Sequence, residues 1–238
     1  MKGGFQNTPL GPITDQEVKL LSLSVIIPAY NEERTVADVV RAALASPYRD
    51  DVIVVNDGSE DQTASQAQAA GARVLELPEN SGKGAAMKAG ALAAYHPVLL
   101  FLDADLIGLR PEHIVHLARP VLENKADMAV GIFEQGRSAT DLAQMVAPYL
   151  SGQRAIKKEI LLDVYALADT RYGVEVAITR HFRDRPHLRS QVVFLFGLTH
   201  RMKEEKLGLV EGFKARMKMY WEVGSVILER ERRTDRRG

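Results

Sequence analysis

The stretch Val-Leu-Leu-Phe-Leu-Asp-Ala-Asp, residues 98–105, decides the fold class of this chain. Its first five residues are apolar and end at a turn, which predicts a buried central strand. Asp103 and Asp105 follow directly, and in open α/β sheets ligands bind beyond the carboxyl ends of the strands. Carboxylate oxygens suit Mg²⁺ or Mn²⁺ that also binds a ligand's phosphates. The alternative is a turn in which the aspartates only cap the next segment.

Three further apolar runs, each followed by a polar loop, precede this stretch. The runs are residues 25–27, 52–55 and 74–77, and their loops are residues 28–33, 56–61 and 79–84. A helix-like segment of about 10–14 residues follows each run, which is the rhythm of βαβ units. The sequence therefore predicts an α/β fold with a central, mainly parallel sheet flanked by helices, and polar loops gathered on one sheet edge.

Each of these loops has a functional and a structural interpretation. Asp57 is placed to accept hydrogen bonds from a base, and Gly82 and Lys83 let amides and an ammonium approach phosphate. Alternatively, Asp57 belongs to an ordinary turn, Gly82 serves turn geometry, and Glu32 complements a helix dipole. Four loops of similar chemistry on one edge favour a ligand site.

The segments "SVIIPAYNEERTV", "VIVVNDGSEDQT", "ENSGKGAAMKAG" and "LLFLDADL", in that order, resemble the family 2 glycosyltransferases of the GT-A fold. The resemblance covers roughly residues 22 to 135 and implies a half that binds a UDP- or GDP-sugar with Mg²⁺ or Mn²⁺. It implies that Asp105 is a metal ligand and catalytic residue. The residues implied to bind the nucleotide sugar are Pro28, Ala29, Tyr30, Glu32, Asp57, Gly82, Lys83, Asp103 and Ala104.

Residues 150–159, 171–178 and 199–208 are similar to segments of polyprenyl-phosphate sugar synthases and glucosyl-phosphoglycerate synthase-like enzymes. This resemblance implies that His200 completes the metal site with Asp103 and Asp105. Glu175 either orients an acceptor hydroxyl as a catalytic residue or is an ordinary helix glutamate.

The same segments carry the cations predicted to bind the acceptor, which are Arg154, Arg201, Lys203 and Lys206. For Arg154 the alternative is an ion pair with Asp163 or Glu159 on a neighbouring turn. For the loop after residue 199 the alternative is a surface turn of solvated charges.

Two signatures of related enzymes are absent from the sequence. The chain lacks the Gln-x-x-Arg-Trp segment of processive members and the Glu-Asp pair that supplies a base in many inverting members. An acceptor that is already an anion needs no strong base, so polyprenyl phosphate or a small phosphorylated metabolite fits. A retaining front-face transfer is the other interpretation.

We expect an N-terminal extension, residues 1–21, and a single GT-A domain, residues 22–238. Its nucleotide-sugar half spans residues 22–135, with 128–132 as the last central strand, and its acceptor half spans residues 136–238. In the acceptor half we expect helices over 157–167 and 173–181, a strand over 191–197, and a C-terminal amphipathic helix.

That C-terminal helix has an apolar face from Leu209 to Leu228 and an arginine-rich end. It packs on the core, on a second subunit in a homodimer, or on anionic lipid. The sequence shows no signal peptide and no run of about 18 apolar residues. We therefore expect a cytoplasmic protein, peripheral at the inner face of the membrane if this helix binds lipid.

The composition excludes several classes of function. Thirty-one basic and 31 acidic residues give zero net charge, so we expect no nucleic-acid partner. The absence of cysteine excludes thiolate metal sites. Neither a G-x-G-x-x-G dinucleotide fingerprint nor the glycine-rich loop of nucleotidyltransferases follows the first strand. The sequence predicts a metal-dependent hexosyltransferase, with a catalytically silent nucleotide-sugar-binding protein as the alternative.

Overall fold

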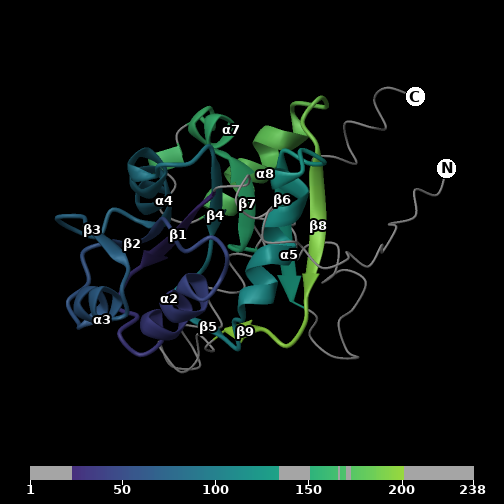
Figure 1. Ribbon diagram of the computed structural model, residues 1–238. Coiled ribbons are helices and arrows are strands. Elements are labelled where there is room, and N and C mark those ends of the chain that lie inside the picture. Colours follow the sequence, from purple (N-terminus) through teal and green to yellow (C-terminus); the bar gives the residue numbers. More distant parts are fainter. Residues whose placement is uncertain (1–22, 134–150, 166, 170–172, 201–238) are drawn as a thin grey trace, which may run out of the picture.

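The computed structural model describes residues 23–133, 151–165, 167–169 and 173–200, and a seven-stranded sheet runs through them (Figure 1). Four neighbouring strand pairs are parallel, and β7 is antiparallel to both of its neighbours. In sheet order the strands are β3 (Arg73–Glu76), β2 (Val52–Asn56), β1 (Leu23–Ala29), β4 (Val98–Phe101), β7 (Arg154–Lys157), β6 (Met128–Phe133) and β8 (Ser190–Leu195). The predicted mainly parallel α/β sheet is confirmed.

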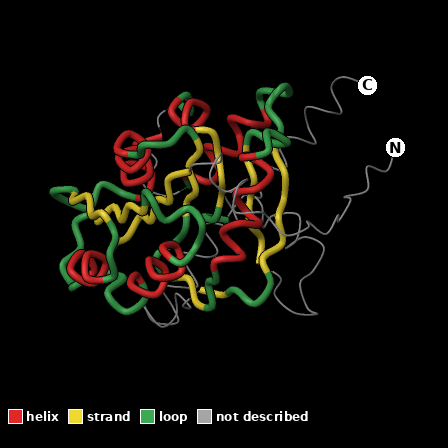
Figure 2. The backbone as a smooth tube through the Cα atoms, in the orientation of Figure 1, coloured by secondary structure: helices red, strands yellow, loops and turns green. Residues whose placement is uncertain are grey.

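Helices cover both faces of this sheet (Figure 2). One layer holds α2 (Val36–Leu44), α3 (Thr63–Ala69) and α5 (Pro111–Leu122). The other holds α4 (Lys83–Ala93), α7 (Lys158–Leu162), the 3-10 helix η1 (Leu167–Asp169) and α8 (Val174–Arg183).

The alternation of side chains along β1 explains the two layers. Val25 and Ile27 pack into the cluster beneath α2 and α5, whereas Ile26 packs into the cluster beneath α4 and α8. All three are fully buried, because a central strand of a doubly covered sheet is apolar on both faces. The apolar run around β4 follows the same rule from Leu99 to Leu102.

The second half of the sheet confirms one prediction and corrects another. The strand predicted over residues 128–132 is β6, the last strand inside the sheet, and β8, where a strand over 191–197 was predicted, lies beyond it at the sheet edge. The helix predicted over 157–167 is too long. Residue 157 belongs to β7, and the helix α7 that follows it ends at Leu162 after five residues. Strand β7 contains a single Ala-Ile pair between charged residues, so its sequence carries no strand periodicity.

A small second sheet lies below the main one in Figure 1 and joins distant parts of the chain. In it, β5 (Leu106–Ile107) pairs antiparallel with β9 (Thr199–His200). The N-terminal extension, the polar stretch 134–140 and the C-terminal helix lie outside the described residues, and the division into one domain stays a prediction. Among the described residues, no helix combines the length and the apolar character needed to cross a membrane.

Candidate active site

The loops after β1 and β2 are tied together at the carboxyl edge of the sheet. Asn31 donates its backbone N–H to Ser59 Oγ at 3.0 Å, and its side-chain oxygen accepts from the N–H of Glu60 at 3.0 Å. Glu32 donates its backbone N–H to Thr63 Oγ1 at 2.7 Å. Asn31 has a φ of 55°, which asparagine tolerates better than most residues. These contacts fix the first loop before any ligand arrives.

The side chains predicted to bind the base differ in exposure within this loop. Pro28 is half-buried and Ala29 is buried at the end of β1, whereas the Tyr30 side chain is 43% exposed. Glu32 is half-buried. Tyr30 therefore offers the open aromatic surface of the group.

Asp57 joins the second loop to the third from a buried position. Its Oδ1 accepts the N–H of Ser81 at 2.8 Å, and its Oδ2 accepts the N–H of Gly82 at 2.9 Å. A Cβ at Gly58 would lie 2.6 Å from the carbonyl carbon of Glu79, so the two loops touch along their backbones. Asp57 thus shapes the start of α4, a role the sequence prediction of a base contact did not include.

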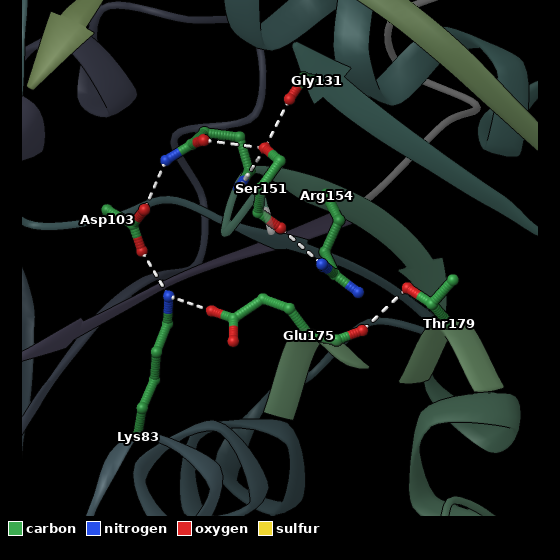
Figure 3. A network of polar contacts seen from close by, with 8 residues as sticks. Lys83, Asp103, Gly131, Ser151, Arg154, Glu175 and Thr179 are labelled. Carbon is green, nitrogen blue, oxygen red and sulfur yellow. Dashed lines mark hydrogen bonds and ion pairs between the residues drawn. The ribbon is translucent and has the colours of Figure 1, made fainter. Parts of the chain in front are cut away.

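Lys83, the first residue of α4, lies between two carboxylates from distant parts of the chain (Figure 3). Its Nζ is 2.6 Å from Asp103 Oδ1 and 2.6 Å from Glu175 Oε1. Burial alone would lower the pKa of Lys83, but the charges of Asp103 and Glu175 outweigh it and raise the pKa above its ordinary value. The ammonium stays charged and joins the predicted nucleotide-sugar half to helix α8.

The segment before β7 completes the surroundings of Asp103. Gln153 donates from Nε2 to Asp103 Oδ2 at 2.6 Å, while Ser151 Oγ donates to Gln153 Oε1 at 3.0 Å and also bonds the Gly131 carbonyl. A Cβ at Gly152 would lie 2.6 Å from Lys83 Nζ and closer still to the Asp103 carboxylate. The sequence-based prediction gave no role to Gly152 or Gln153, although a glutamine shortly before the Ala-Ile pair of β7 was a usable signal.

Arg154 lies behind this network with no exposed surface (Figure 3). Its Nη2 donates to the backbone oxygen of Ser151. The alternative ion pair with Asp163 is wrong, because Asp163 lies instead against His181 at 3.6 Å and Arg185 at 3.4 Å. No ion pair joins Arg154 to Glu159 within the described residues. A phosphate would reach Arg154 only after the chain around it moved.

Backbone pairing places the segment after Asp105 beside the strand that ends at His200. Asp105 is half-buried, and the next residue, Leu106, stands opposite His200 in the β5–β9 ladder. Both Asp103 oxygens already accept hydrogen bonds, from Lys83 and Gln153. Within the described part of the chain, no three His, Cys, Asp or Glu side chains form a ready metal cluster. The carboxylates nevertheless fit Mg²⁺ or Mn²⁺, whose remaining ligands in such sites come from phosphates and water.

The predicted acceptor residues Arg201, Lys203 and Lys206 lie outside the described residues.

Comparison with known proteins identifies relatives of this arrangement. The family model of glycosyl transferase family 2 matches residues 24–182. Dolichyl-phosphate beta-glucosyltransferase of Drosophila melanogaster is 46% identical over 101 residues, which are 36% of this chain and 31% of that protein. Glucosyl-3-phosphoglycerate synthase of Mycobacterium tuberculosis is 34% identical over 121 residues, 47% of this chain and 37% of that protein. The chain thus spans well under half the length of these curated relatives.

Solved structures agree in fold. Glucosyl-3-phosphoglycerate synthase from Mycobacterium tuberculosis, in complex with Mn²⁺, UDP-glucose and glycerol 3-phosphate, superposes with a TM-score of 0.68 at 26% identity. The match covers 82% of this chain and 79% of that one. The same synthase in complex with phosphoglyceric acid gives a TM-score of 0.65 at 27% identity, covering 79% and 74% of the two chains. The predicted GT-A fold is therefore confirmed.

Proposed function

Because the chain belongs to glycosyl transferase family 2, we propose that it transfers a sugar from a nucleoside diphosphate sugar to a phosphorylated acceptor. The observation that carries this proposal is the ammonium of Lys83 held between Asp103 and Glu175. Asp103 follows the strand after which family 2 sequences carry their paired aspartates, and Glu175 lies on a helix of the other half. One cation therefore stands where donor and acceptor would meet.

On the donor side, each residue has a distinct task. The loop with Tyr30 would hold the base, and Lys83 would exchange a carboxylate for a phosphate oxygen of the donor. Asp105, assisted by Asp103 and His200, would hold Mg²⁺ or Mn²⁺, which supplies charge neutralisation of the leaving diphosphate. Stabilisation of the charge that develops on the leaving diphosphate would be the main catalytic contribution of this site.

On the acceptor side, a phosphorylated substrate fits both the site and the relatives. The names of the relatives include dolichyl phosphate, phosphoglycerate and, for a Rhizobium johnstonii protein 34% identical over 136 residues, dodecaprenyl phosphate. An anionic acceptor oxygen needs no strong base, and Glu175 would orient the acceptor from α8. Arg201, Lys203 and Lys206 would bind the acceptor's phosphate.

The choice between a lipid-borne and a small acceptor depends on residues 209–238. Their apolar face and arginine-rich end would dock on anionic lipid if the acceptor is a polyprenyl phosphate. Packing on a second subunit in a homodimer is the competing use of that face. Binding to phosphatidylserine vesicles that falls with salt, and with deletion of residues 209–238, is the result expected of the lipid interpretation.

A two-stage experiment tests the function. Thermal shift with UDP, GDP and their sugars, with and without Mn²⁺, identifies the donor, because a ligand of the folded state raises its stability. Sugar transfer is then followed on phosphoglycerate, glycerol 3-phosphate and a short polyprenyl phosphate. We expect metal-dependent transfer that Asp105→Ala abolishes and that Asp50→Ala, at an exposed residue before β2, leaves intact. Nucleotide binding without transfer or donor hydrolysis would instead indicate a catalytically silent binding protein.

A further inference from the structure

Arg154 is a buried cation whose hydrogen-bonding capacity is mostly unused. It is 0% exposed and is the largest fully buried side chain among the described residues. Its Nε and Nη1 have no hydrogen-bond partner within that part of the chain. Buried donors are normally paired, and leaving them unpaired costs free energy. A residue kept in this state calls for an explanation beyond packing.

The charges around Arg154 supply an explanation for its unpaired donors. Burial lowers the pKa of Arg154, while the carboxylates of Glu175 and Asp103, in that order, raise it. Neither carboxylate forms a close ion pair with Arg154, since both are bonded to Lys83 instead. Among the described residues, the network thus contains two carboxylates, one cation in contact with both, and the guanidinium of Arg154, which lies beside Ser151 and Glu175 (Figure 3).

Ligand binding would change this balance. If Lys83 turns toward a donor phosphate, Glu175 loses its ion pair while its side chain is only 14% exposed. Removing one partner of a buried charge pair is strongly destabilising, because the other charge is left uncompensated. Arg154 has two nitrogens with unused donors, and a guanidinium can serve two oxygen acceptors at once.

We propose that Arg154 is a positioning residue that compensates the charge of Glu175 when Lys83 turns to a phosphate of the donor. This role rests on the proposed function, because it requires a ligand with a phosphate. It also replaces the direct acceptor contact predicted for Arg154 from the sequence. The buried charge of Arg154 lowers the free-energy cost when Lys83 exchanges Glu175 for a phosphate, so α8 need not move.

The test compares ligands with and without phosphates. Arg154→Met, Arg154→Lys and wild type are titrated calorimetrically with UDP or GDP at fixed Mg²⁺, and with the matching nucleoside by ligand-observed NMR. In Arg154→Met, Lys83 is the one remaining cation beside Glu175 among the described residues, so its transfer to phosphate costs more. We expect diphosphate affinity to fall about tenfold or more while nucleoside affinity changes less than about twofold. Arg154→Lys should restore most of the loss. Lys88→Met, which removes an exposed cation from α4, the helix of Lys83, should change neither affinity.

A second measurement needs no ligand. In urea unfolding, the stability lost through Arg154→Met should be smaller in a Glu175→Gln background, because the two groups interact. Arg154→Gln replaces Arg154→Met if the latter does not fold. Equal losses in both backgrounds, or equal falls of nucleoside and diphosphate affinity, would overturn the proposal. If wild type binds no nucleoside diphosphate, the proposed function fails, whereas the unfolding cycle still decides whether Arg154 and Glu175 are coupled.

Discussion

The two sides of the site are built by different interactions. On the proposed donor side, the loops after β1, β2 and β3 hold one another through hydrogen bonds between side chains and backbone amides, such as those of Asp57 and Asn31. On the proposed acceptor side, α8 reaches the site through the ion pair of Glu175 with Lys83. Hydrogen bonds to backbone amides persist when a ligand enters. An ion pair of an ammonium competes directly with a ligand's phosphates. The donor side is therefore preformed, and the acceptor side depends on what occupies the centre.

The largest effect should come from removing the shared cation. Lys83→Met takes away both ion pairs and the proposed phosphate contact, so we expect transfer activity to fall about 100- to 1,000-fold. The expected loss lies mainly in kcat, because the phosphate charge develops as the bond to the sugar breaks. Steady-state kinetics on the donor and acceptor found by the screen measure it.

Lys88→Met on the same helix is the matched control and should retain activity. If Lys83→Met keeps wild-type kcat, the two sides do not meet through this ammonium, and the comparison between them loses its basis.

The same contrast explains what the sequence could predict. The donor side follows continuous apolar runs with polar ends, and those runs placed β1, β2, β3 and β4 within about two residues. The fold class and the place of Asp57, Lys83 and Asp103 followed from them. The predicted acceptor half is different, because its first described strand, β7, has only one Ala-Ile pair between two charged residues and therefore carries no apolar run that would predict a strand.

Contacts between residues far apart in the sequence could not be predicted from local sequence patterns. The pairing of Lys83 with Glu175 joins residues 92 positions apart, and no local pattern encodes such a pair. Gln153 was passed over because a buried glutamine is unusual and is only explained by its acceptor, Asp103. The burial of Arg154, predicted as an acceptor ligand, likewise depends on tertiary packing.

A pair of glycine substitutions separates the centre of the site from the donor-side core. In Gly152→Ala the new Cβ would overlap the Asp103 carboxylate and lie 2.6 Å from Lys83 Nζ, so the ion pair must move. We expect activity to fall about 10- to 100-fold, since small displacements of reacting groups carry such costs. The free energy of unfolding should change less than in the partner variant.

That partner is Gly90→Ala on α4, where the new Cβ would lie 2.5 Å from Ile26 Cγ2 and 3.0 Å from Val55 Cγ2. Overpacking of this kind costs about 1–3 kcal/mol, partly offset by about 1 kcal/mol of helix propensity. Activity per folded molecule should be kept. Urea unfolding and steady-state kinetics on Gly152→Ala and Gly90→Ala test this difference. Equal activity losses in the two variants would contradict the idea that Gly152 affects the site and Gly90 affects only the core.

Asp57→Ala tests whether the donor side is preformed. Two backbone amides, of Ser81 and Gly82, would lose a charged acceptor in a half-buried place, which should lower the free energy of unfolding by about 1–3 kcal/mol. Affinity for the free nucleoside diphosphate should fall with it, because the start of α4 is no longer fixed. Asp57→Asn keeps an acceptor oxygen and should lose less. Unchanged stability in Asp57→Ala would mean that the loops hold without this clamp, and that only a base contact was removed.

The smallest predicted effect concerns pH and the anchor of the segment that carries His200. His113 on α5 accepts the N–H of Arg110 at Nδ1, 3.1 Å away, so its Nε2 carries the hydrogen and donates to the Phe196 carbonyl at 3.0 Å. Burial, and then the charge of Arg110, lowers the pKa of His113 below its ordinary value. Protonation at Nδ1 would end the bond from Arg110.

A histidine whose pKa is lower in the folded state takes up its proton first in the unfolded chain. Stability is then at its full value above the unfolded pKa, about 6.5, and falls as the pH drops below it toward the folded pKa. His181, whose pKa is also lowered by burial and then by Arg185, acts in the same window, so a single substitution removes only part of the slope.

We expect thermal unfolding between pH 7.5 and about 5.5 to show a shallower fall for His113→Asn than for wild type. His187→Asn, at an exposed position, should keep the wild-type slope. In the loops after β1 and β2, Asp61 accepts the N–H of Glu33 at 3.2 Å; burial would raise the pKa of Asp61, but hydrogen bonds from Thr63 and Glu33 lower it, so this bond persists over this range. An unchanged slope in His113→Asn would show that the acceptor-side segment is anchored as independently of pH as the donor side.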